Sequence, residues 1–276
     1  YLRKSDASGL YIPQVYIYET AFSDDELLEV HKNLWSSGIV PLFYVVTPTE
    51  VKIFNCSKSL EEKGKRKSDL KVSPIKTFSF VGNIQKELER EKFSARLFVN
   101  GAFWDEHPEI LKVSESPYEK LLSGLLNAKR HLEQKSLSLS KSTISKLLIL
   151  GILVKYLEEK EDEHGTKLLE ISRDFYEKFP GCEQFTDILR QKGQIIPFLK
   201  ELDVRFNGRV FDLKSDEERE LANADLTYVA HIFDADIEGY QFVLWKNYSF
   251  NFLPIELISG IYEAFLKNDK EKGVVY

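Results

Sequence analysis

Methionine is absent from the 276 residues, and cysteine occurs only twice, at Cys56 and Cys182. Two cysteines this far apart, without a CxxC pair or a histidine at metal-ligand spacing, exclude a disulfide-rich scaffold and a zinc module. Such sparse cysteine usage is typical of a reducing compartment, so we expect a cytoplasmic protein. Residue 1 is tyrosine, and we therefore expect the natural start to precede it.

Long hydrophobic runs are also missing. The most apolar stretch, residues 147–154, has eight residues and includes Gly151, whereas a membrane-spanning helix needs about 20. No signal-peptide pattern precedes that stretch. The sequence therefore predicts no contact with a membrane.

Positive charge is scarce, because 38 Lys and Arg face 44 Asp and Glu and the net charge is −6. A nucleic-acid-binding domain usually carries an excess of positive charge, so any DNA contact must be local. The five histidines are scattered and predict no metal site. Gly208 and Gly273 each stand without a glycine partner, so no phosphate-binding loop is predicted.

What the chain does contain is enough apolar surface for two domains, with 43% apolar and 13% aromatic residues. Residues 1–81 predict a small mixed α/β unit. Ser23 and Glu26 form a capping box that opens a helix ending near Gly38. The predicted strands are rich in Tyr, Ile, Val and Phe and cover residues 10–18, 41–46, 50–55 and 77–81.

Residues 82–276 predict an all-helical domain, so the expected fold class is α+β. Pro117 follows Ser116 as the first residue of a long helix. Residues 144–157 are apolar on most sides, which predicts a helix at the centre of a bundle, and the acidic residues 158–163 predict a loop after it. Shorter helices are predicted at residues 184–191, 195–202, 216–222, 226–233 and 254–267.

Glu50 and Lys52 are the candidate catalytic residues. They lie two apart on a predicted strand and should point to the same face. Nucleases of the PD-(D/E)xK type use this spacing, with the carboxylate binding Mg²⁺ and the lysine orienting water or phosphate. An ExK triplet is also frequent by chance in a chain with 30% charged residues. An active nuclease, a degenerate nuclease-like fold and an unrelated α/β unit all remain open.

The candidate DNA-binding residues lie between Lys58 and Lys76, where seven Lys and Arg face three Asp and Glu. Each phosphate that a Lys or Arg neutralises releases counterions and so adds binding affinity, whatever the DNA sequence. The alternative is a solvated connection between two strands. The residues expected to contact phosphates are Lys63, Lys65, Arg66, Lys67 and Lys71.

Segments along the whole chain are similar to the amino-terminal region of adenine-specific DNA methyltransferases of single-chain, type IIG-like restriction–modification systems. Residues 248–266 (YSFNFLPIELISGIYEAFL) and 272–276 (KGVVY) resemble the aromatic strand, loop and helix that precede the catalytic domain of that family. Other similar segments are residues 9–19 (GLYIPQVYIYE), 34–55 (LWSSGIVPLFYVVTPTEVKIFN), 92–98 (KFSARLF) and 206–211 (FNGRVF).

The resemblance implies an order of nuclease-like unit, helical connector and then methyltransferase domain. The S-adenosylmethionine (AdoMet) loop and the adenine-gripping loop of the family do not occur in these residues, so AdoMet is expected to bind a domain that follows Tyr276. We expect no cofactor here, with Mg²⁺ only if the nuclease alternative holds. The expected partners are double-stranded DNA and the C-terminal methyltransferase domain.

Three hypotheses follow. The first is an N-terminal module that positions DNA or partner domains for adenine-N6 methylation of a flipped base. The second is a Mg²⁺-dependent endonuclease domain of the same enzyme, and the third is a non-catalytic structural connector.

Overall fold

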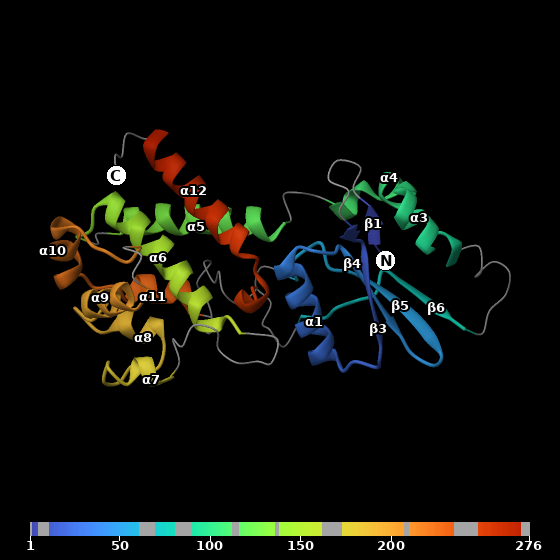
Figure 1. Ribbon diagram of the computed structural model, residues 1–276, viewed down its shortest axis with the longest axis horizontal. Coiled ribbons are helices and arrows are strands. Elements are labelled where there is room, and N and C mark those ends of the chain that lie inside the picture. The colour runs from blue at the N-terminus through green and yellow to red at the C-terminus, as the bar shows by residue number, and fades with distance from the viewer. Residues whose placement is uncertain are drawn as a thin grey trace. The chain divides into compact units, whose positions relative to one another are not determined.

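The computed structural model divides into two compact units, Tyr1–Lys120 and Leu121–Tyr276. The first contains a four-stranded mixed sheet with one helix, and the second is mainly helical, which confirms the α+β class (Figure 1). The sequence pattern predicted a domain boundary after residue 81. In the structure, the first compact unit ends in the sequence at residue 120. The structure describes residues 2–4, 11–60, 70–80, 90–111, 116–135, 138–161, 173–206, 210–234 and 248–271.

The four-stranded sheet has the order β3-β4-β5-β6. β3 pairs in parallel with β4, while β4–β5 and β5–β6 are antiparallel. β4 and β5 form a hairpin, and Thr47 N closes its turn by donating to Glu50 O at 2.9 Å. The strands are β3 (Val15–Glu19), β4 (Leu42–Val46), β5 (Glu50–Asn55) and β6 (Lys76–Ser79).

The first predicted strand, residues 10–18, is divided in two. β2 (Tyr11–Pro13) pairs with β1 (Leu2–Lys4) in a separate two-stranded sheet, and β3 begins after Gln14. Gln14 is buried, and its Oε1 accepts a hydrogen bond from Trp104 Nε1 at 2.7 Å. The division therefore falls at a residue held by a distant side chain.

Helix α1 (Asp24–Ser37) covers one face of the four-stranded sheet. Its predicted capping box is confirmed, because Glu26 N donates to Ser23 Oγ and Ser23 N donates to Glu26 Oε2. Leu34 packs there with Phe43 and Phe54, whose rings stack with centroids 4.9 Å apart. Alternate residues of β4 therefore face α1.

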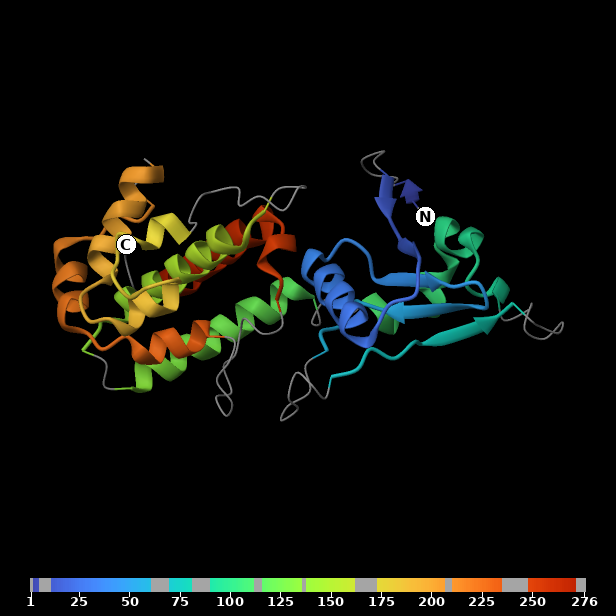
Figure 2. The same ribbon diagram turned by 90° about the horizontal axis from the view of Figure 1, so that it is seen from below.

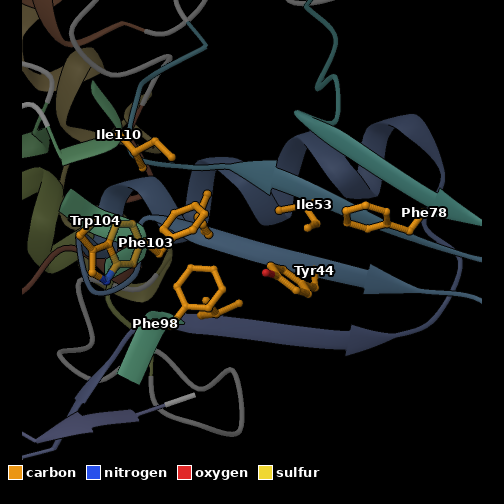
Figure 3. Packing of buried hydrophobic residues seen from close by; sticks show 9 residues of the cluster. Tyr44, Ile53, Phe78, Phe98, Phe103, Trp104 and Ile110 are labelled. Carbon is orange, nitrogen blue, oxygen red and sulfur yellow. The ribbon is translucent and has the colours of Figure 1, made fainter. Parts of the chain in front are cut away.

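The opposite face of the sheet is covered by the short helices α3 (Ala95–Asn100) and α4 (Ala102–Glu106). Phe98, Phe103 and Trp104 pack there with Tyr44 and Ile53, as Figure 3 shows. Burying each aromatic side chain contributes about 1.5–3 kcal/mol. This burial explains why the helices group with the sheet. The short helix η2 (Pro108–Leu111) follows them.

The helical unit is built around α6 (Lys141–Glu159), whose buried residues lie on most of its sides, which confirms the predicted central helix. The last helix, α12, lies along α6 in both views of Figures 1 and 2 and buries Ile258, Ile261 and Phe265. The other helices are α5 (Pro117–Gln134), α7 (Arg173–Tyr176), α8 (Phe185–Arg190), α9 (Ile195–Phe206), α10 (Ser215–Asn223), α11 (Thr227–Phe233), η5 (Phe250–Phe252) and α12 (Ile255–Glu271).

Gly151 allows α11 to approach α6 closely. A Cβ atom added at Gly151 would lie 2.2 Å from Phe233 Cζ, far inside van der Waals contact. The ring of Phe233 is 1% exposed, so it has no open space into which to move. The glycine that interrupts the apolar run in the sequence is therefore required by packing.

Candidate functional site

Glu50 and Lys52 lie on β5 and point to the same face of the sheet, because Lys52 Nζ is 2.9 Å from Glu50 Oε1. This is the α1 face, since Phe54 lies at the same alternation and packs in the α1 core. Their side chains are 32% and 40% exposed. An exposed ion pair of this kind contributes about 0–1 kcal/mol.

Catalysis by Glu50 would require further metal ligands beside it. Within the described ranges no group of three or more His, Cys, Asp or Glu side chains is placed to hold a metal ion. The nearest cation, Lys52, already contacts the Glu50 carboxylate. The structure thus brings together the two residues of the ExK triplet, and it assigns them to one accessible ion pair.

Of the five residues predicted to contact phosphates, Lys71 lies within the described residues. Lys71 is exposed on the approach to β6. Lys63, Lys65, Arg66 and Lys67 lie outside the described residues, so their role stays a prediction.

A buried polar cluster lies at the C-terminal end of α6, where the sequence pattern predicted an acidic loop from residue 158. That prediction is wrong for Glu158 and Glu159, which belong to the last turn of the helix. The Glu158 carboxylate accepts hydrogen bonds from Tyr176 Oη and from Phe185 N, the latter at 2.7 Å. Lys155 Nζ lies 2.9 Å from Glu158 Oε2. The α6 cluster, Lys155, Glu158, Tyr176 and Phe185, therefore fixes α7 and α8 onto α6.

The electrostatics of this cluster favour a structural role. Burial, followed by the nearby Glu158 carboxylate, raises the pKa of Tyr176 far above that of a free phenol. The phenol therefore stays protonated and donates its hydrogen bond at every physiological pH. Since Tyr176 cannot ionise there, this arrangement supplies a fixed donor rather than a base.

Glu159, the last residue of α6, and the two residues that follow the helix hold η5 in the same manner. Phe250 N donates to Glu159 Oε2 at 3.1 Å, and Lys160 Nζ donates to Asn251 O at 2.7 Å. Glu161 N donates to Asn251 Oδ1 at 2.9 Å. The start of the 248–266 segment is thereby anchored to α6 through polar groups.

Two aromatic residues of this region, Tyr248 and Phe250, are buried in the core of the helical unit. Phe252 is 45% exposed and is not part of that core.

His31 is a buried titratable group in the α1 core. Its Nε2 lies 3.0 Å from Asn55 O, so Nε2 must carry the proton. Its Nδ1 is buried and finds no partner among the described residues. Burial lowers the pKa of His31 to about 4 because a second proton would create an unpaired charge in an apolar core.

Cys56 lies in the same core, and its thiol donates to Val40 O. Burial raises the pKa of this thiol to about 12, so it is an unreactive core residue rather than a nucleophile.

The helical unit has a shallow depression between α6 and α10 whose enclosed volume is about 0 Å³. Ligand pockets usually measure about 300–1,000 Å³. Two of its polar residues, Lys146 and Glu217, already contact each other at 2.6 Å. The depression therefore offers neither room nor free charge to a small ligand. It is lined by Thr143, Lys146, Leu147, Leu150, Leu213, Glu217 and Leu221.

Comparison with protein-family models, with curated proteins and with solved structures gives no match for this chain. In the part of the chain that the structure describes, none of the helices combines the length and the apolar composition needed to cross a bilayer.

Proposed function

We propose that this chain is the N-terminal module of a restriction–modification DNA adenine-N6 methyltransferase. In this proposal the module positions DNA or partner domains, and a domain following Tyr276 binds AdoMet and transfers the methyl group. The catalysed step would be methylation of the exocyclic amine of a flipped adenine.

The observation that carries the proposal is where the family-like segments lie in each unit. Residues 34–55 include the end of α1 and both strands of the central hairpin, and they supply Phe43, Val45 and Phe54 to the core. Residues 248–266 include η5 and most of α12, which bury Phe250, Ile258 and Phe265. A likeness concentrated in core-building segments favours a shared fold over a chance match of surface residues.

DNA contact in this proposal comes from the basic connection between β5 and β6. Lys71 lies at its C-terminal end and is exposed, and this local excess of positive charge contrasts with a net charge of −6 for the chain. Binding by phosphate contacts alone is weak, tolerant of sequence and sensitive to salt.

The test is fluorescence anisotropy of a labelled DNA duplex at several salt concentrations. Neutralising Lys65, Arg66 and Lys67 together should reduce the slope of log K against log salt by about 2–3, roughly one for each lost phosphate contact. A matched control neutralises two lysines and one arginine in the helical unit, all exposed there: Lys178, Lys200 and Arg219.

The control should leave the slope unchanged. An equal slope in the parent chain and the triple variant would show that the connection between β5 and β6 does not contact DNA. Plasmid nicking that requires Mg²⁺ and disappears in Glu50→Ala would instead favour the endonuclease alternative, whereas intact plasmid would count against that alternative.

A further inference from the structure

Phe80 is an exposed aromatic residue that directly follows β6. Alternation along the strand places it on the same side of the sheet as Phe78. Phe78 is buried in the core beneath α3 and α4, whereas Phe80 is 50% exposed. Its backbone continues the pairing of β6 with β5, because Phe80 N donates to Thr49 O at 2.9 Å. An aromatic ring that faces water is therefore held at a defined position beside the hairpin turn.

Arg90 lies against the ring of Phe80. Its guanidinium carbon, Cζ, is 6.0 Å from the centroid of that ring, and its Nη2 donates to the backbone oxygen of Ser79. The hydrogen bond holds the guanidinium beside the ring, whose aromatic face attracts the positive charge. Aromatic rings and guanidinium planes both stack on unpaired bases. Two groups of this kind are thus placed together, and we call Phe80 and Arg90 the Phe80 platform.

The sequence around the Phe80 platform is positively charged. Residues 70–100 contain six Lys and Arg and three Glu, an excess of three positive charges, whereas the whole chain has a net charge of −6. This local charge favours a polyanionic partner such as the phosphate backbone of a nucleic acid. The exposed cations of this stretch among the described residues are Lys71, Lys92 and Arg96.

We propose that an unpaired base of single-stranded DNA stacks on the Phe80 platform while the nearby Lys and Arg side chains contact its phosphates. This inference rests on the proposed function, which supplies DNA as the polyanion. Aromatic side chains on a positively charged surface are the common means of binding single strands, and they accept any base because every base has an aromatic face. A duplex fits the platform less well, since its bases cover one another.

Fluorescence anisotropy of the full 276-residue chain with a labelled 20-nucleotide oligothymidylate tests this proposal. Phe80→Ala should weaken the binding about 5- to 150-fold, because a base loses its stacking partner. Phe80→Trp should retain the affinity, since tryptophan also presents an aromatic face. Phe252→Ala is the matched control, because Phe252 is similarly exposed at 45% but belongs to η5 in the helical unit, and it should bind like the parent chain.

Salt and an abasic strand separate stacking from charge. The Phe80 ring neutralises no phosphate, so Phe80→Ala should leave the slope of log K against log salt unchanged. An abasic strand of the same length keeps the phosphates and lacks the bases. The parent chain should therefore bind the abasic strand more weakly than oligothymidylate, and this comparison remains available if Phe80→Ala fails to fold.

Three results would overturn the proposal. They are no binding of oligothymidylate by the parent chain, equal affinities of the parent chain for the two strands, and a folded Phe80→Ala that binds oligothymidylate like the parent chain. The proposed function would fail on a different measurement, namely a longer parent protein that neither binds AdoMet nor methylates duplex DNA. That result does not depend on Phe80.

Discussion

At the residue scale, Gly151 shows how packing can outweigh helix propensity. Alanine is normally better than glycine inside a helix by about 1 kcal/mol. Here the new methyl group would overlap the buried ring of Phe233. We expect Gly151→Ala to lower the free energy of unfolding by about 1–3 kcal/mol, measured by urea denaturation.

The double variant Gly151→Ala/Phe233→Leu provides the control for this steric explanation. Leucine is shorter than phenylalanine, so the alanine should cost less in that background than in the parent chain. An equal cost in both backgrounds would mean that the Phe233 ring is not the obstacle.

His31 gives stability a defined dependence on pH. Its pKa falls from 6.5 in the unfolded chain to about 4 in the folded one, so the unfolded state binds the proton more readily between these values. The stabilisation is complete above pH 6.5 and is lost as pH falls toward 4. The shift corresponds to about 3 kcal/mol.

Urea unfolding of the parent chain and of His31→Gln across this range measures the effect. Glutamine keeps an amide donor near Asn55 O but does not titrate, so its stability should fall less as pH decreases. Parallel curves for the two proteins would show that other groups control the acid sensitivity.

At the element scale, the α6 cluster connects α6 to α7 and α8 through one carboxylate. Glu158→Ala leaves the buried Lys155 with only the more distant Glu159 carboxylate, 4.0 Å away, and removes the acceptor for two donors. We expect a loss of about 3–5 kcal/mol in unfolding free energy. Tyr176→Phe removes one hydroxyl and should cost about 1 kcal/mol.

Chemical denaturation of both variants, followed by far-UV circular dichroism, distinguishes these losses. Similar small losses in the two proteins would indicate that the Glu158 carboxylate is solvated rather than shared by the α6 cluster.

Local sequence signals predicted several elements correctly. The capping box at Ser23 and Glu26 and the strands on either side of Thr47 depend on neighbouring residues. By contrast, Glu158 was assigned to a loop because acidic runs are usually solvated. Its burial depends on Tyr176 and Phe185, which are 18 and 27 residues away in sequence. No local pattern contains that information.

At the scale of the whole molecule, the proposed function predicts that AdoMet binding and methyl transfer belong to another part of the parent protein. The AdoMet loop and the adenine-gripping loop do not occur in the 276 residues. We therefore expect isothermal titration calorimetry of this chain to give no heat of AdoMet binding. A longer chain that continues past Tyr276 should bind AdoMet and methylate DNA. Micromolar AdoMet binding by the 276 residues would refute this assignment.

The sequence by itself determined the fold class, the central position of α6 and the placement of Glu50 and Lys52 on one face of a strand. These features follow from periodicity, capping and alternation, which act over a few residues. Only the tertiary structure decided that α3 and α4 belong with the sheet, that Glu158 is a buried acceptor and that β3 lies beside β4. Each of these depends on which distant segments meet, because burial and strand partners are properties of the packed chain.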